Sequence, residues 1–406
     1  MKYFYSDLVR DVSYLELIKE INQSKKYKLI SNHSDYYLIF KDIIVSLLND
    51  SEIVLIDSDL SKSEIYKFNI SEYDLNKMIV CDFPDVIDYI DLINRIKNSK
   101  NWQMVLFTSG TTGIPKRVVH KLSNLIRMVK INEERGLDIW GFAYNPSHIA
   151  GVQVFFQALL NINHIVRLFN LPVEKIYELI NKYNVTNISA TPTFFRLLKN
   201  ANIKFETVKR ISSGGERFDN KLFNDLQRMF PNAKILNIYA STEFGTLFAS
   251  KGENFVIKDE FRDKIKIYDS ELFVHKSLLG ILDENNLMGD WYKTGDKVEV
   301  LKENPLTIKI LGRSNEFVNV GGYKVLITEV EEYINSIPGV IKSKVYSKRN
   351  SVLGSILVCE VEVNDNSLTE TKIFNYLLNN LQPYKIPRII KIVNEIETTT
   401  TGKIKR

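Results

Sequence analysis

The central part of the chain alternates short apolar runs with amphipathic stretches, and this order restricts the possible folds more than any other feature. Apolar residues keep helical spacing in 173–183 and in 218–230. The runs 185–191, 208–213 and 234–241 are short, contain apolar residues and read as strands. Strands and helices that alternate at these intervals predict a parallel sheet with helices on its faces. Ligands bind such sheets in the loops at the carboxyl ends of the strands.

The pattern changes twice in the second half of the chain. Residues 255–312 contain strand-like runs separated by polar turns, which predict a mostly β subdomain. After Arg313, a helix, two strands and another helix predict a compact α+β unit. We therefore expect an α/β protein. Its large N-terminal domain, residues 1–313, would combine parallel-sheet α/β layers with the β-rich subdomain, and a small α+β domain, residues 314–406, would follow.

Composition excludes several classes of protein. The 406 residues are 44% hydrophobic and 25% charged, as in soluble globular proteins. The net charge of +5 is small and the lysines are scattered, so we expect no nucleic-acid partner. No apolar stretch approaches the roughly 20 residues that cross a bilayer, and the N-terminus lacks the apolar core of a signal peptide. Cys81 and Cys359 match no metal or redox spacing. A cytoplasmic protein is expected.

The stretch LFTSGTTGIPKRVVH, residues 106–120, follows a strand-like run and is rich in hydroxyls and glycines. Its small residues are Thr108, Ser109, Gly110, Thr111, Thr112 and Gly113. Such residues let successive backbone N–H groups point into one anion-binding concavity, and Lys116 adds a mobile charge suited to a terminal phosphate. A flexible surface turn is the alternative. The stretch is not a Walker A loop, because Ile-Pro-Lys follows Gly113.

Further segments occur together with this loop in a fixed order. They are YNPSHIAG (144–151), SSGGE (212–216), YASTE (239–243), YKTGD (292–296), GRSNEFVNVGGYKV (312–325), LQPYKIPR (381–388) and TTTTGKIKR (398–406). With FTSGTTGIPK they resemble the motifs of the AMP-forming acyl-CoA synthetases and their adenylation-domain relatives. The resemblance extends from about residue 36 to the end. Only about 100 residues precede the loop, fewer than this family generally carries.

The resemblance implies a two-step reaction. A carboxylate attacks the α-phosphate of ATP to give an acyl adenylate and pyrophosphate, and a thiol then displaces AMP. ATP, Mg²⁺ and coenzyme A, or a carrier-protein phosphopantetheine, are the implied cofactors. The resemblance also implies that the C-terminal domain is mobile and rotates about a hinge at Asn315.

Each motif carries implied site residues. Thr108 to Gly113 and Lys116 would hold the β- and γ-phosphates, Thr242 the α-phosphate, and Glu243 the Mg²⁺ ion. Gly215, Glu216 and Tyr239 would bind the adenine, and Asp296 and Arg313 the ribose. His148 would lie beside the acyl carboxylate. Lys403 would neutralise the carboxylate and the α-phosphate. Each residue also has a structural alternative, such as a helix start for Thr242 and Glu243, a core position for Tyr239 or a frayed terminus for Lys403.

The substrate is a non-amino-acid carboxylic acid by the same resemblance. Relatives that activate amino acids carry an aspartate near Ser147 and His148, whereas 146–151 contains no carboxylate. An aryl or aliphatic acid is therefore favoured.

The chain departs from the family pattern at Arg117, Ala240, Asn315 and Glu397. None of these changes removes a charge that the chemistry needs, but the one at Asn315 weakens the hinge inference.

Three functions remain open from the sequence. They are an acyl- or aryl-CoA ligase, a stand-alone adenylating enzyme that loads a carrier protein, and a nucleotide-binding sensor without catalysis. The joint presence of Lys116, Glu243, Asp296, Arg313 and Lys403 argues against the sensor.

Overall fold

The computed structural model describes residues 2–60, 65–108, 116–198, 203–216, 218–282, 287–313, 316–320, 323–350, 354–365, 367–398 and 404. The chain divides into two compact units. The first comprises Met1–Phe218, Leu222–Gly252 and His275–Tyr292, and the second comprises Asp219–Lys221, Glu253–Val274 and Lys293–Arg406.

The first unit is built around a sheet that has eight strands among the described residues, in the order β14-β13-β12-β11-β9-β10-β1-β2. Its strands are β1 (Tyr3–Ser6), β2 (Asp11–Ser13), β9 (Ile139–Phe142), β10 (His164–Arg167), β11 (Asn187–Ala190), β12 (Arg210–Gly214), β13 (Lys234–Ser241) and β14 (Gly245–Ser250). The six inner strands run parallel, and β2 and β14 are antiparallel edges. The predicted parallel sheet is therefore confirmed.

Two smaller sheets complete the strands of this unit. They are β4-β5-β7-β8 and the pair β3-β6. Their strands are β3 (Lys26–Lys28), β4 (Ile30–Ser31), β5 (Ile53–Leu55), β6 (Met78–Val80), β7 (Gln103–Thr108) and β8 (Lys116–Lys121), and β18 (Leu287–Met288) pairs with the start of β19. The helices are α1 (Tyr14–Gln23), α2 (Tyr36–Leu48), α4 (Glu72–Leu75), α5 (Tyr89–Lys97), α6 (Leu122–Ile126), α7 (Ile149–Leu159), α8 (Val173–Lys182), α9 (Pro192–Leu197) and α10 (Asn220–Met229).

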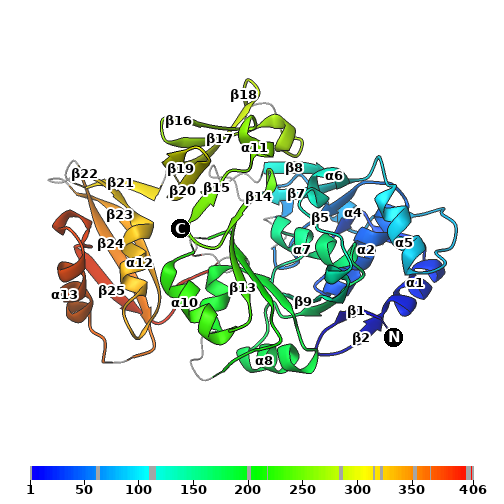
Figure 1. Ribbon diagram of the computed structural model, residues 1–406, viewed down its shortest axis with the longest axis horizontal. Coiled ribbons are helices and arrows are strands. Elements are labelled where there is room, and N and C mark those ends of the chain that lie inside the picture. The colour runs from blue at the N-terminus through cyan, green and yellow to red at the C-terminus, as the bar shows by residue number, and fades with distance from the viewer. Residues whose placement is uncertain are drawn as a thin grey trace. The chain divides into compact units, whose positions relative to one another are not determined.

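Helices cover both faces of the large sheet because successive strand residues point to opposite sides. Phe142 of β9 packs into a buried cluster with α2 and α7, whereas the next residue, Ala143, belongs to a cluster with α8 and α10. The ribbons of α7 and α8 lie on opposite sides of β9 (Figure 1). Phe40 of α2 stacks on Phe155 of α7 with ring centroids 4.7 Å apart. The large sheet is therefore buried on both faces, as is typical of parallel sheets.

The second unit is rich in strands. Antiparallel pairing joins β15 (Asn254–Val256), β16 (Ile265–Tyr268), β17 (Glu271–His275), β19 (Trp291–Glu303) and β20 (Leu306–Arg313) in the pairs β15-β20, β16-β17 and β19-β20. The chain continues through α11 (Asp259–Arg262), β21 (Phe317–Val320), β22 (Tyr323–Leu326), α12 (Ile327–Asn335), β23 (Val340–Asn350), β24 (Gly354–Val363), α13 (Glu370–Asn380) and β25 (Ile389–Val393). The predicted fold class, α/β with a C-terminal α+β region, is confirmed.

None of the described helices combines the length and the apolar character that crossing a bilayer requires.

Candidate nucleotide and acyl site

Most predicted site residues of the first unit lie at the carboxyl ends of its strands. His148 follows β9, Gly215 and Glu216 follow β12, and Tyr239 stands near the end of β13, just before Thr242 and Glu243. This is the edge where parallel α/β sheets bind ligands. The three motifs that contribute these residues are far apart in sequence, and the parallel strands β9, β12 and β13 of one sheet bring them to the same edge.

The predicted phosphate loop connects two strands of the four-stranded sheet. β7 ends at Thr108 and β8 begins at Lys116, and these two residues are antiparallel partners. Ser109, Gly110, Thr111, Thr112 and Gly113 lie outside the described residues, as do Asn315 and Lys403.

The backbone of Thr242 and Glu243 is fixed by two segments from elsewhere in the chain. The carbonyl oxygen of Thr242 accepts a hydrogen bond from His120 Nε2 at 2.7 Å. The carbonyl oxygen of Glu243 accepts one from the Gly280 backbone N–H at 2.8 Å. Because His120 belongs to β8, it links the strand that leaves the phosphate loop to Thr242, the residue before the predicted metal ligand.

Phe244, the next residue, is held in the same way. Its carbonyl oxygen accepts from Arg127 Nη2 at 2.6 Å, while Nη1 of the same arginine donates to Leu278 O at 3.0 Å. Three successive carbonyl groups, 242 to 244, thus have fixed donors. Side chains that project from such a backbone are oriented before any ligand arrives.

Burial favours the neutral form of His120 in this arrangement. A carbonyl oxygen can only accept, so Nε2 carries the proton. Burial lowers the pKa of His120, and the hydrogen bond to Thr242 acts in the opposite direction. A side chain at Gly280 would place its Cβ 2.8 Å from His120 Cε1, so only glycine permits this close approach.

The Glu216 carboxylate serves a structural purpose in the predicted adenine turn. It accepts from the backbone N–H of Thr193 at 3.1 Å and from its hydroxyl at 2.7 Å, at the first turn of α9. Gly215 has a φ of +83°, which favours glycine. The ring of Tyr239 stacks on Phe248 of β14 at 5.7 Å. The turn is therefore anchored to α9 through Glu216, and the Tyr239 ring is anchored to β14.

His148 lies beside a carboxylate that the sequence reasoning missed. Its Nε2 is 3.8 Å from Oδ2 of Asp57, which follows β5 and is 7% exposed. A carboxylate therefore lies near His148, although 146–151 contains no acidic residue. Asp57 carries no recognisable motif, and only the parallel pairing of β5 and β7 shows where its segment lies.

In the second unit, Asp296 and Arg313 form a pair. They face each other across β19 and β20, with Arg313 Nε 2.8 Å from Asp296 Oδ1. The backbone N–H of Asp296 donates to Thr294 Oγ1 at 3.0 Å, and Arg313 Nη1 donates to Thr294 O at 3.1 Å. The Asp296 carboxylate is thus held by Arg313, which is itself held by the Thr294 carbonyl oxygen.

The donor set fits a nucleotide bound with Mg²⁺. Mg²⁺ takes hard oxygen ligands and is usually held by one or two carboxylates together with substrate phosphates. Glu243 offers such a carboxylate from a fixed backbone, and Lys116 offers a cation at the end of the loop.

A profile of the AMP-binding enzyme family matches residues 28–267, more than half of the chain. The chain belongs to the AMP-binding enzyme family. The AMP-binding enzyme C-terminal domain also matches, over residues 329–403. The predicted family is therefore confirmed.

Two relatives of this chain have low sequence identity to it. Acyl-coenzyme A synthetase ACSM1 of Mus musculus is 25% identical over 76% of this chain and 61% of its own length. VraA of Staphylococcus epidermidis is 23% identical over 98% of this chain and 92% of its own length. The chain thus spans about three fifths of ACSM1 but nearly all of VraA.

Solved structures of family members share the fold. O-succinylbenzoate CoA synthetase (MenE) from Bacillus subtilis, in complex with the acyl-adenylate intermediate OSB-AMP, matches with a TM-score of 0.74 at 19% identity, over 99% of this chain and 94% of that chain. The same protein in complex with ATP and a magnesium ion matches with a TM-score of 0.72 at 19% identity, over 99% of this chain and 95% of that chain.

Proposed function

We propose that this protein activates a carboxylic acid with ATP and transfers the acyl group to a thiol. The favoured thiol is that of coenzyme A. In the first step a carboxylate oxygen attacks the α-phosphorus, the bond to the β-phosphate breaks, and pyrophosphate leaves. In the second step the thiol sulfur attacks the acyl carbon and AMP leaves. The observation that carries the proposal is the fixed backbone of residues 242 to 244 at the carboxyl edge of the sheet.

The roles of individual residues follow from the motifs and their local contacts. The phosphate loop and Lys116 would hold the β- and γ-phosphates, and Thr242 the α-phosphate. Asp296, oriented by Arg313, would accept both ribose hydroxyls, and the turn at Gly215 and Glu216 would frame the adenine with Tyr239. His148, beside Asp57, would border the acyl carboxylate. Mg²⁺ on Glu243 would neutralise charge on the departing phosphates.

The substrate class is a non-amino-acid carboxylic acid, aryl or aliphatic. Support comes from the names of relatives, which include acyl-coenzyme A and o-succinylbenzoate CoA synthetases. A carrier-protein phosphopantetheine is the alternative thiol, because the same site would serve it. The C-terminal region, with Lys403, would rotate between the two steps.

The cytoplasm is the compartment that suits this function. Cys81 and Cys359 are buried free thiols. Burial raises the pKa of the Cys81 thiol to about 11, so it is unreactive near neutral pH.

Exchange of labelled pyrophosphate into ATP, measured over a panel of carboxylic acids, tests the proposal. Exchange that depends on one class of acid supports it and names the acid. Nucleotide binding without exchange for any acid would instead identify a sensor. Addition of coenzyme A, or of a carrier protein bearing phosphopantetheine, then shows which thiol receives the acyl group.

A further inference from the structure

The side chain of Glu243 has a partner that the proposed reaction does not use. Oε1 of its carboxylate accepts a hydrogen bond from the Tyr292 hydroxyl at 2.9 Å. A carboxylate can only accept, so the phenol is the donor. Hydrogen bonds to charged acceptors are stronger than those between neutral groups. The two residues stand far apart in sequence but belong to the same compact unit.

Tyr292 is a fixed donor. Its side chain is buried, and its backbone pairs with Leu287 in the hairpin of β18 and β19. Gly280 also contacts Glu243, because its N–H donates to the Glu243 carbonyl oxygen. Gly280 and Tyr292 therefore hold Glu243 by both its backbone and its side chain.

We propose that Tyr292 is a positioning residue for the Mg²⁺ ligand Glu243. The hydroxyl engages Oε1 and so restricts rotation of the carboxylate, whose other oxygen, Oε2, would serve as the metal ligand. The inference rests on the proposed role of Glu243. Groups that orient a metal ligand typically change metal affinity by 10- to 100-fold when removed, because the ligand must then be ordered by the metal itself.

The opposing interpretation is that Tyr292 only packs and that its hydroxyl satisfies a buried polar contact. The two interpretations differ in one observable. A packing residue affects the thermal midpoint, whereas a positioning residue affects the dependence of nucleotide binding on Mg²⁺.

Tyr292→Phe separates them because it removes one oxygen atom and keeps the ring. Tyr27→Phe is the matched control. Tyr27 is also buried, and its hydroxyl donates at 2.8 Å to the carbonyl oxygen of Glu52, which is not one of the predicted site residues. The measurement is binding of a non-hydrolysable ATP analogue by the full-length protein, titrated with Mg²⁺ and repeated without metal.

We expect Tyr292→Phe to raise the apparent Mg²⁺ dissociation constant about 10-fold. Binding of the analogue without metal should stay as in the wild type, and the thermal midpoint should fall no more than in Tyr27→Phe. Tyr27→Phe should leave the Mg²⁺ constant unchanged. An unchanged Mg²⁺ constant in Tyr292→Phe overturns the inference while the role of Glu243 stands.

A second pair of variants covers the case in which loss of the hydroxyl acts through stability. In a Glu243→Gln background, Tyr292→Phe should have no further effect on the Mg²⁺ constant, because the hydroxyl acts only through the carboxylate. An equal shift in both backgrounds overturns the inference. If Glu243→Gln itself binds Mg²⁺ with the analogue as the wild type does, it is the proposed role of Glu243 that fails.

Discussion

Uncharged hydrogen-bond donors fix the two residues, Thr242 and Glu243, that are predicted to bind the α-phosphate and the Mg²⁺ ion. The Thr242 carbonyl binds a neutral imidazole from His120, and the Glu243 carboxylate binds a phenol from Tyr292. A neutral donor fixes its acceptor without adding a formal charge that would compete for the incoming phosphate or ion. The formal positive charge that the reaction needs is then left to Mg²⁺, Lys116 and, by the family resemblance, Lys403.

Lys403 is the residue expected to act in adenylation and not in folding. It stands in a threonine-rich tail without an apolar stripe, so Lys403→Ala should leave the thermal midpoint nearly unchanged. Loss of a cation that stabilises transition-state charge should reduce acid-dependent pyrophosphate exchange about 100-fold or more. Lys405→Ala removes a neighbouring charge of the same tail and should keep exchange. Wild-type exchange in Lys403→Ala would remove this lysine from the mechanism.

His164 gives a prediction about pH. Its Nε2 lies 2.7 Å from the Ser6 hydroxyl, which donates to Asp11, and burial lowers its pKa to about 4, with Asp11 acting against the shift. The unfolded state, with a histidine pKa of about 6.5, binds the proton first as the pH falls. Stability is therefore complete above about pH 6.5 and is lost as the pH falls toward about 4.

Urea unfolding of the wild type and of His164→Gln checks this sign. Between about pH 7.5 and about pH 5, the wild type should lose about 2 kcal/mol more of its free energy of unfolding than the variant, whose amide can still donate to Ser6 but cannot take up a proton. Parallel pH profiles for the two proteins would contradict the assignment.

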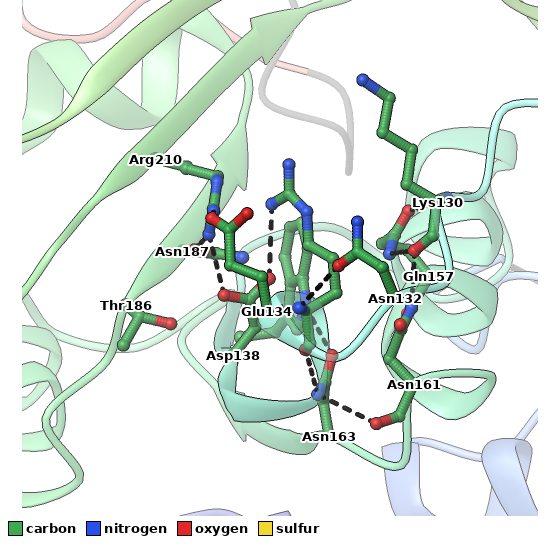
Figure 2. A network of polar contacts seen from close by, with 12 residues as sticks. Lys130, Asn132, Glu134, Asp138, Gln157, Asn161, Asn163, Thr186, Asn187 and Arg210 are labelled. Carbon is green, nitrogen blue, oxygen red and sulfur yellow. Dashed lines mark hydrogen bonds and ion pairs between the residues drawn. The ribbon is translucent and has the colours of Figure 1, made fainter.

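At the scale of elements, the carboxyl ends and the amino ends of the strands in the large sheet bear different groups of residues. The carboxyl edge holds the candidate site. The amino edge holds a polar network at the starts of β9, β11 and β12, in which Arg210 lies between Asp138 and Glu134 (Figure 2). Asp138 is 4% exposed and also pairs with Arg135 at 3.3 Å. Asn163, in turn, donates to the Arg135 carbonyl oxygen at 2.8 Å. This network ties 134–138 to the sheet.

The network predicts a stability effect that spares the site. Arg210→Met should lower the free energy of unfolding by about 2–3 kcal/mol, because it leaves the buried Asp138 carboxylate with one cation fewer. Lys175→Met breaks an exposed ion pair with Glu178 and should change the free energy of unfolding by less than about 1 kcal/mol. Denaturant titration compares the two variants. Equal small effects would show that the network does not stabilise the sheet.

Elements with strong local periodicity could be predicted from the sequence. The helix expected over 173–183 is observed as Val173–Lys182, and the strand expected over 234–241 as Lys234–Ser241. Strand β25 was missed, because Ile389–Val393 is a short run in a basic tail whose pairing with β24 is non-local. Contacts such as His120 with Thr242 were missed for the same reason. They join segments that share no motif, and periodicity says nothing about them.

At the scale of the whole molecule, the motifs and their order identified the family because each motif answers one chemical demand of adenylation. The demands are a nest for phosphates, a carboxylate for Mg²⁺, a carboxylate for ribose hydroxyls and a cation for the reacting oxygens. The nature of the acid depends instead on the shape of a pocket. That shape arises from side chains of several strands and helices, and no single motif encodes it.

The central claim is that a carboxylate oxygen attacks the α-phosphorus of ATP. A single-turnover reaction with the cognate acid labelled with heavy oxygen in its carboxylate, followed by mass analysis of the products, tests it most directly. When the thiol displaces the nucleotide, the bridging oxygen must leave with it, so AMP should carry one heavy oxygen atom and pyrophosphate none. Heavy oxygen recovered in orthophosphate, with ADP as the nucleotide product, would contradict adenylate formation.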